Sequence, residues 1–251
     1  MNLPLILVAV LLMAAGGLAA LLTHRFPRVS AVCGAGGAVA GCLLGLVQPL
    51  RVIARGAAES WTRPWSVPFG WFSIEIDLLS ACFLVPVLVL SALAAIYGHE
   101  YLASWRGRRS LGGSWLFFNA LVGGMIVVLI VRNAVLFLVA WELMSLASFF
   151  LVTFEHDKED VRRAGWTYLV ATHIGTAFLF ALFLLIGRHT GSLNFPAAGS
   201  VPAALAGTLF LLAVVGFGTK AGFMPFHIWL PEAHPAAPSH VSALMSGVMI
   251  K

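Results

Sequence analysis

Residues 216–240 read GFGTKAGFMPFHIWLPEAHPAAPSH and follow an apolar run that begins near Ala203. As one helix, residues 203–232 would be about 45 Å long, well beyond the ~30 Å hydrocarbon core of a bilayer. The helix must therefore bend or break. Lys220 lies near the middle of this segment, so its surroundings depend on where the break falls.

Glycines and a proline predict the position of the break. Pro225 has no N–H to bond the carbonyl of Ala221, and Gly218 and Gly222 weaken the helix just before it. A broken helix inside a membrane needs protein or a water-filled cavity to satisfy its freed backbone groups. We therefore expect polar surroundings beside Lys220. The alternative is a kinked helix whose lysine extends to the membrane surface.

The composition indicates an all-α integral membrane protein. Hydrophobic residues make up 60% of the 251 residues, charged residues 10%, and the mean hydropathy is +0.95. The net charge of +5 comes from arginines scattered through short loops, so a nucleic-acid partner is not expected. Cys33, Cys42 and Cys82 have no His or Cys at ligand spacing, and no metal site is predicted.

Eight apolar segments predict about eight transmembrane helices, of which the seventh is broken. They are residues 3–22, 29–49, 78–97, 114–131, 134–154, 164–187, 203–232 and a segment starting near Val241.

Three further features lie between or within these spans. Gly37, Gly41 and Gly45 recur every four residues, which predicts a closely packed interior helix. Residues 51–77 form the longest predicted loop, and the alternation in its last residues favours a short strand or hairpin. Residues 155–163 are densely charged and are predicted to be a solvated loop.

The last predicted helix is short. From Ser239 to Lys251 it rises only ~18 Å, little over half of the hydrocarbon core. We therefore expect the sequence to be the N-terminal part of a longer polypeptide, or a truncated reading frame. Eight Lys and Arg residues fall in one set of alternate loops and five in the other, which predicts the first set to be cytoplasmic and the N-terminus to be outside.

Three charged residues lie deep in apolar sequence: Glu142, Lys220 and Lys251. Glu142 lies ~13 Å from the start of its helix, near the middle of the membrane. A charge at this depth costs ~2.5–3.5 kcal/mol, so such residues normally face the protein interior and pair or titrate. A carboxylate beside a lysine favours both charged forms, and separating the two favours release of the lysine's proton.

Four histidines are candidate proton relays: His173 within a predicted span, and His227, His234 and His240 near the helix break. A single histidine in a polar patch is more commonly a hydrogen-bonded structural residue, so that reading stays open for each.

Two motifs carry a family resemblance. WELMSLAS at 141–148 and KAGFMPFHIWLPEAHPAAPSH at 220–240, continuing to Lys251, resemble the antiporter-like, proton-translocating membrane subunits of respiratory complex I, Mrp-type antiporters and membrane-bound nickel-iron hydrogenases. The form of the second motif is most similar to the hydrogenase 4 and formate hydrogenlyase branch.

The resemblance implies that the chain has two regions and that the redox cofactors belong to other subunits. Residues 1–110 are an N-terminal three-helix membrane segment with an external loop at 51–77, and residues 111–251 are the first five-helix proton-translocating unit. By motif, Glu142, Lys220 and Lys251 are its proton-translocating residues. In the family a second, inverted unit follows, which this sequence lacks. The family chain binds no redox cofactor, because nickel-iron and iron-sulfur centres belong to partner subunits.

The leading functional hypothesis is a proton-translocating subunit of a hydrogenase-type or complex I-type oxidoreductase in the cell inner membrane. Its partners would be other membrane-arm subunits, a peripheral redox arm and the lipid bilayer. One alternative is an Mrp-like cation/proton antiporter subunit. The other is a non-transporting scaffold in which buried charges fix helix register. The sequence contains no nucleophile elbow, phosphate-binding loop or clustered metal ligands.

Overall fold

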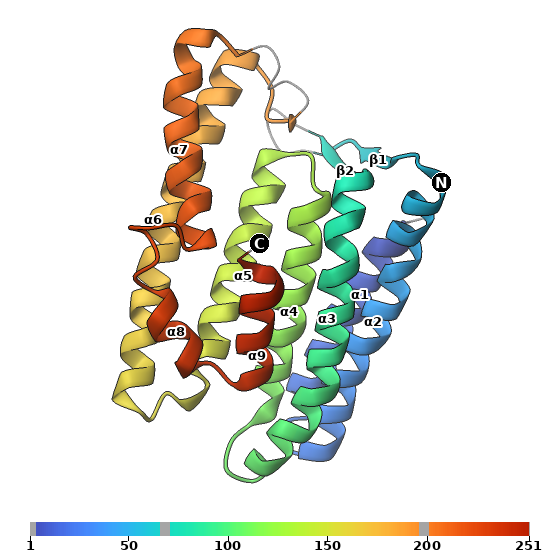
Figure 1. The fold of residues 1–251 in the computed structure, drawn as a ribbon. Helices are drawn as coiled ribbons and strands as arrows, with labels where there is room; N and C mark the ends of the chain where they lie inside the picture. Colours follow the sequence, from blue (N-terminus) through green and yellow to red (C-terminus); the bar gives the residue numbers. More distant parts are fainter. Residues whose placement is uncertain (1–3, 66–70, 196–200, 251) are drawn as a thin grey trace.

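The computed structural model describes residues 4–65, 71–195 and 201–250 of the chain, so Lys251 lies outside the described residues. Within these ranges, seven helices are long and apolar enough to cross a membrane, which confirms the predicted all-α membrane fold (Figure 1). They are α1 Leu5–Leu22, α2 Pro27–Arg55, α3 Leu78–Tyr101, α4 Leu111–Ile130, α5 Ala134–Val152, α6 Glu159–Thr190 and α7 Ala203–Ala221.

Shorter elements follow the seventh span. They are helices α8 Leu230–Ala236 and α9 Ser239–Leu244 and a π-helical turn at Met245–Met249, which together correspond to the predicted break and the start of the eighth span. Helix α8 packs against α6, whereas α9 packs against α3 and α5. The chain therefore leaves the α6–α7 pair after the break and returns to the other helices (Figure 1).

Glycines bring α1 and α2 close together. A Cβ added at Gly37 would lie 2.7 Å from the Cα of Gly16, and one added at Gly41 would lie 2.5 Å from the Met13 side chain. A Cβ added at Gly45 would lie 3.1 Å from the Leu88 side chain on α3. Only small residues permit such approach, so the predicted role of α2 as an interior packing helix is confirmed.

The predicted hairpin is present, but the loop around it is shorter than expected. Strands β1 Glu59–Arg63 and β2 Phe72–Ile76 pair antiparallel. Helix α2 continues through Arg55 and ends at Gly56, which has a φ of 67°. The predicted loop start at residue 51 was wrong because no helix-breaking residue lies between Pro49 and Gly56, whereas Gly56 can adopt the left-handed conformation that ends a helix.

Hydrogen bonds from Arg132 link the hairpin to the connection between α4 and α5. Its Nη2 donates to Asp77 at 2.8 Å, its Nε donates to Glu75 at 3.3 Å, and its backbone N–H donates to the carbonyl of Ser73 at 2.9 Å. Asn133, the next residue, caps α5 by accepting the backbone N–H groups of its first turn. The short connection is therefore rigidly placed at the hairpin end of the bundle.

The charged segment 155–163 is only partly a loop. Helix α6 begins at Glu159, so the second half of the predicted loop forms the first turn of a helix. Glu159 and Asp160 lie in that turn, where acidic side chains interact favourably with the positive end of the helix dipole. The prediction of a fully irregular segment was wrong because charge density alone does not distinguish a solvated loop from a solvated helix end.

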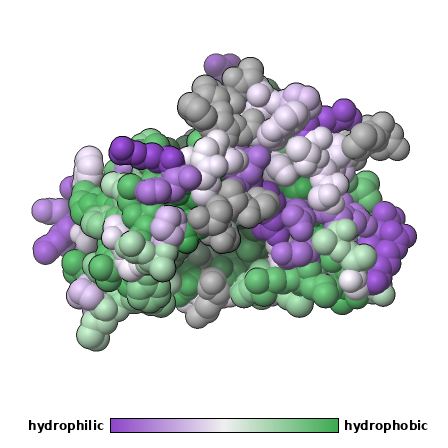
Figure 2. All heavy atoms as spheres, turned by 90° about the horizontal axis from the view of Figure 1, so that it is seen from above, coloured by the Kyte–Doolittle hydropathy of each residue, from purple (hydrophilic) through white to green (hydrophobic). Residues whose placement is uncertain are grey.

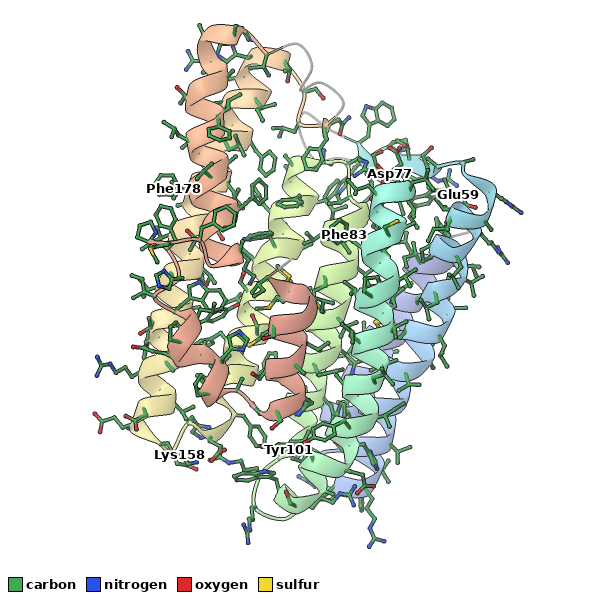
Figure 3. All side chains as sticks on the ribbon, viewed as in Figure 1. Glu59, Asp77, Phe83, Tyr101, Lys158 and Phe178 are labelled. Atoms are coloured by element: carbon green, nitrogen blue, oxygen red, sulfur yellow. The ribbon has the colours of Figure 1, made fainter. Side chains whose placement is uncertain are left out.

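Polar and charged residues gather at the two ends of the bundle. Glu59 and Asp77 lie at the hairpin end, and Lys158 lies near the opposite end (Figure 3). Figure 2 looks onto the hairpin end, where hydrophilic residues spread across the surface and hydrophobic residues cover the flanks. This distribution is the one expected for a bundle whose flanks contact lipid.

Candidate functional site

Lys220 is buried at the end of α7, with 4% of its surface exposed. Its Nζ donates hydrogen bonds to the hydroxyl of Tyr168 at 2.9 Å and to the hydroxyl of Ser145 at 3.3 Å. Ser145 belongs to α5 and Tyr168 to α6. The lysine therefore joins three helices and points into the protein, away from the membrane surface.

Aromatic rings complete the surroundings of the ammonium group. Lys220 Nζ lies 5.8 Å from the ring centroid of Trp141 and 5.4 Å from that of Tyr168. Both distances fall within the ≈ 6 Å range in which a cation is attracted by an aromatic face. These rings and the two hydroxyls replace part of the hydration that the lysine loses on burial.

The helix break leaves backbone groups that other parts of the chain satisfy. Helix α7 ends at Ala221, and Gly222 follows it with a φ of 74°. The indole Nε1 of Trp229 donates to the carbonyl of Thr219 at 2.8 Å, and the N–H of Phe223 donates to the carbonyl of Gly218 at 2.9 Å. The residues after the break thus fold back and stabilise the end of the helix that carries Lys220.

The predicted break residues have different positions. Gly222 ends the helix, and Pro225 lies in the irregular segment between α7 and α8. Gly218 lies inside α7, and a Cβ added to it would lie 3.1 Å from the Phe223 ring.

Tyr168 links the lysine to a further polar group. Its hydroxyl lies 2.5 Å from the Oγ of Ser148, which also donates to the carbonyl of Met144 at 2.8 Å. The edge of the fully buried Trp229 packs against the Tyr168 ring, with centroids 5.0 Å apart. The hydroxyls of Ser145 and Tyr168 therefore contact the buried amine directly, and the hydroxyl of Ser148 is linked to it through Tyr168.

Glu142 contacts His173 rather than Lys220. Its Oε2 lies 3.5 Å from the Nε2 of His173, whose Nδ1 is 2.9 Å from the carbonyl of Leu169. Within the described part of the chain, Glu142 and Lys220 form no direct ion pair, and Glu142 Oε1 is buried without a hydrogen-bond partner. The two charged residues are nevertheless linked through α5, because Ser145 lies one helical turn after Glu142.

The other three histidines lie apart from the lysine's hydrogen bonds. His234 Nδ1 is 3.1 Å from Ser242 Oγ, and His227 is partly buried in the segment after the break. His240 is 1% exposed and packs against Gly98 and Tyr101 on α3. Among the described residues, neither of its ring nitrogens has a hydrogen-bond partner.

An apolar cavity of about 250 Å³ opens beside Lys220. It is lined by Trp141, Phe217, Lys220 and Met249, among others, and so reaches from α5 to the π-helical turn. Over residues 4–65, 71–195 and 201–250, no group of three or more His, Cys, Asp or Glu residues has the arrangement of a metal site.

Sequence reasoning did not assign roles to the residues that hold Lys220. Ser145 and Tyr168 are separated from it by 75 and 52 residues, so spacing gives no direct signal. A weaker signal was present, because Tyr168 is one of only three tyrosines and lies well inside a predicted span, where a hydroxyl needs a partner.

The fold and this site define a multi-pass membrane protein whose broken helix presents a buried lysine to the hydroxyls of two neighbouring helices. Residues 132–251 match the family described as "NADH:quinone oxidoreductase/Mrp antiporter, TM". The chain belongs to this family of antiporter-like membrane subunits.

Individual relatives agree with this membership. The chain is 42% identical over 185 residues to Hydrogenase-4 component B of Escherichia coli, covering 73% of this chain and 27% of the relative. It is 30% identical to NADH-quinone oxidoreductase subunit N of Deinococcus radiodurans, covering 80% of this chain and 43% of that relative. The chain thus spans less than half of the length of either.

A solved structure shows the same fold. The Mrp complex from Dietzia sp. DQ12-45-1b matches with a TM-score of 0.81 at 22% identity, over 98% of this chain and 27% of that chain. The likeness extends over nearly all of the present chain, including the region before the family match at residue 132.

Proposed function

We propose that this chain contributes a proton-translocating region to a membrane subunit of a hydrogenase-type or complex I-type oxidoreductase, with Lys220 as the central proton carrier. One observation carries the proposal: the buried Nζ of Lys220, at a helix break, is held by hydroxyls from two other helices. The similarity to a hydrogenase component and to a quinone oxidoreductase subunit supports the class of complex.

The hydroxyl partners suit a group that changes its protonation state. An ammonium donates to Tyr168 and Ser145, as the observed distances indicate. A neutral amine has a lone pair, and either hydroxyl can rotate to donate to it. Both states of Lys220 therefore keep hydrogen bonds, whereas a fixed carboxylate partner would hold the lysine in its charged form.

Glu142 and His173 form an acid–base pair on α5 and α6, the two helices that carry the lysine's hydroxyl partners. We propose that this pair controls the protonation of Lys220. A change in the charge or separation of Glu142 and His173 would move α5, and with it the Ser145 hydroxyl that accepts a hydrogen bond from Lys220. Such movement would change the balance between the charged and neutral amine. His227, His234, His240 and Lys251 remain candidates for passing the proton onward, with Lys251 outside the described residues.

The redox step belongs, in this proposal, to other subunits. Nickel-iron and iron-sulfur centres would lie in a peripheral redox arm, and neighbouring membrane-arm subunits would transmit the displacement. We propose the cell inner membrane as the location. The end of the bundle that carries Arg108, Lys158 and Arg162 would face the cytoplasm, which leaves the N-terminus outside.

The test is Lys220→Met in the full-length protein, assembled in its native complex in inverted membrane vesicles. We expect electron-donor-driven acidification of the vesicles to be lost, because methionine preserves much of the side-chain volume but cannot carry a proton. Lys158→Met is the matched control, since Lys158 is exposed and pairs only with Glu155 among the described residues. Acidification that survives Lys220→Met at the control's level would refute the assignment.

Two alternatives are separated by the same vesicles. An antiporter subunit would dissipate an imposed pH gradient when Na⁺ or K⁺ is added without any electron donor. A scaffold would leave coupling intact in the Lys220→Met/Glu142→Gln double variant. We expect neither result.

A further inference from the structure

A large hollow lies at the end of the bundle opposite the hairpin, away from Lys220. Its volume is about 770 Å³, and it is formed where α4 begins, α5 ends and α6 begins. Arg108, Arg109 and Arg162 line one part of it, together with His156 and Asp157. Aromatic residues, including Phe117, Phe150 and Trp166, line the rest.

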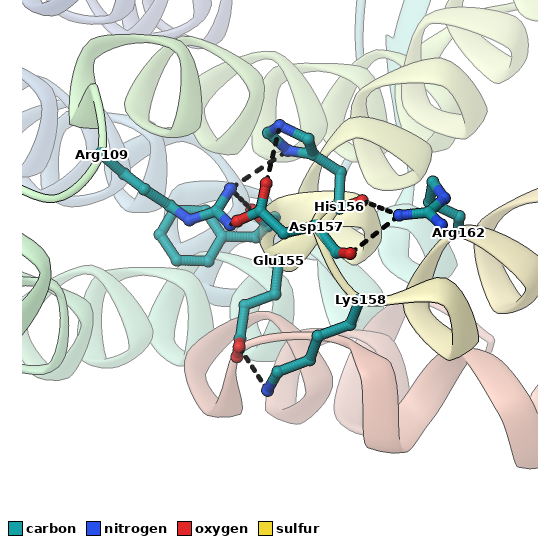
Figure 4. A network of polar contacts seen from close by, with 7 residues as sticks. Arg109, Glu155, His156, Asp157, Lys158 and Arg162 are labelled. Carbon is teal, nitrogen blue, oxygen red and sulfur yellow. Dashed lines mark hydrogen bonds and ion pairs between the residues drawn. The ribbon is translucent and has the colours of Figure 1, made fainter.

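The charges around the hollow do not cancel. Arg109 forms an ion pair with Asp157 and donates to the carbonyl of Phe154 at 2.6 Å (Figure 4). Arg162 donates through Nη1 to the carbonyls of His156 and Asp157, at 2.8 and 2.9 Å, so its charge meets no carboxylate there. Arg108 is exposed and forms no ion pair within the described part of the chain. Two guanidinium charges therefore remain uncompensated.

The apolar part of the hollow includes exposed aromatic surface. Phe117 and Phe150 stack with centroids 4.3 Å apart, and Trp166 is 63% exposed. Ser114 lines the same hollow and is 9% exposed. Its Oγ has no hydrogen-bond partner among the described residues. The site thus combines uncompensated cations, an unused hydroxyl and exposed aromatic surface.

We propose that this hollow binds an anionic phospholipid, with its phosphate at Arg108 and Arg162 and its acyl chains against Phe150 and Trp166. Guanidinium groups bind phosphate oxygens well, and basic pockets between transmembrane helices bind anionic headgroups. The volume is in the range of small-molecule sites. A free phosphate ion would use the arginines but leave the aromatic wall uncovered.

Two variants test the site by independent routes. Arg108→Gln/Arg162→Gln removes the uncompensated charge. Gly113→Leu fills the hollow, because an added Cβ at Gly113 meets nothing within 4 Å and Gly113 is a lining residue. The matched control is Arg25→Gln/Arg28→Gln, which removes two arginines from the same end of the bundle but outside the hollow.

The measurement is native mass spectrometry of the purified, delipidated complex titrated with phosphatidylglycerol or phosphatidylethanolamine. We expect one phosphatidylglycerol to bind, with an apparent Kd about 10-fold weaker in both test variants and unchanged in the control. Equal binding of phosphatidylethanolamine, an unchanged Kd in either test variant, or equal weakening in the control would overturn the proposal. A photo-crosslinker at position 166 that captures a protein subunit instead of lipid would also overturn it.

Discussion

Helices α2 to α4 and helix α7 differ in what they bury. The first three have buried residues along most of their length, and these are mainly glycines, alanines and large apolar side chains, with a few serines and amides. The buried residues of α7 are only Gly216, Gly218, Thr219 and Lys220, all near its C-terminal end. Within this chain helix α7 packs mainly against α6, and its buried residues gather around the lysine.

This difference suggests that α2 to α4 mainly stabilise the fold, whereas the end of α7 serves the proposed function. A close-packed bundle has few alternative arrangements, because its side chains interdigitate at high density. A helix whose fully buried residues gather near one end, beside a helix break, can shift with smaller cost. The region that we propose to move protons is thus the less packed one, and the region around α2 acts as its support.

The supporting region is tested most severely at Gly34. A Cβ there would lie 2.4 Å from the Trp115 side chain, which is fully buried. We expect Gly34→Val to lower the free energy of unfolding by about 3 kcal/mol, because the clash cannot be relieved by a flexible side chain. Thermal unfolding of the purified protein in detergent measures the loss.

Gly36→Ala is the matched control for this change. Gly36 lies on the same helix, and an added Cβ meets nothing within 4 Å. The substitution is expected to leave stability unchanged or raise it slightly, since alanine favours a helix more than glycine does. Equal destabilisation by both variants would mean that α2 is sensitive to any side chain and that close packing at Trp115 is not the reason.

The polar region is tested next at Tyr168. Tyr168→Phe keeps the ring between Lys220 and Trp229 but removes the hydroxyl that accepts from Nζ at 2.9 Å. Because a hydrogen bond to a charged group contributes about 2 kcal/mol, we expect the rate of proton translocation to change by roughly 10-fold or more. The rate is measured as donor-driven acidification of vesicles.

Tyr97→Phe is the control, because Tyr97 is more than half exposed on α3 and is distant from α7 in the chain. Tyr97→Phe should keep the folded stability of the parent protein, and Tyr168→Phe should lose no more than about 2 kcal/mol and stay folded. If Tyr168→Phe unfolds the protein while Tyr97→Phe does not, the hydroxyl is structural and the comparison between the two regions weakens.

The Glu142–His173 contact is tested by a double-mutant cycle. Glu142→Gln and His173→Asn each remove one partner of the 3.5 Å contact. If the two residues act together, the double variant should translocate protons about as well as either single variant, with a coupling of about 1 kcal/mol. Strictly additive losses would show that Glu142 acts on Lys220 without His173.

Much of the fold was predictable because its signals are local. The spans follow from runs of apolar residues, the break follows from Gly222 and Pro225, and the packing of α2 follows from glycines at four-residue spacing. These features depend on neighbours in sequence. The end of α2 was missed by a few residues, since a polar helix end resembles a loop in hydropathy.

The partners of the site residues were not predictable in the same way. Lys220 was identified by its charge in an apolar segment, but which side chains meet it depends on the rotation and tilt of α5 and α6. Ser145 and Tyr168 accept its hydrogen bonds, whereas the expected carboxylate of Glu142 contacts His173. The rotation of α5 decides which of its polar residues faces the lysine, and no local pattern fixes that rotation.

The smallest expected effect concerns the ion pair of Asp77 with Arg132 at the hairpin end, outside the membrane spans. The pKa of Asp77 is lowered, first by the backbone N–H of Ser80, which it accepts as the cap of α3, and also by the charge of Arg132. A lowered pKa means that this carboxylate stabilises the fold above its unfolded pKa of about 3.9, and that the contribution is lost as the pH falls through the folded value. Because Asp77 is partly exposed, we expect less than about 1 kcal/mol.

Asp77→Asn should therefore remove part of the pH dependence of stability. Asparagine can still cap α3, but it cannot lose a proton or pair with Arg132 as an ion. The melting temperature of the variant should fall less steeply than that of the parent protein from roughly pH 5 to pH 3. Glu100→Gln, at the opposite end of α3, is the control and should leave the slope unchanged. If the melting temperatures of Asp77→Asn and of the parent fall in parallel with pH, the charge of Asp77 does not stabilise the fold. The hairpin would then be held by hydrogen bonds that do not depend on this charge.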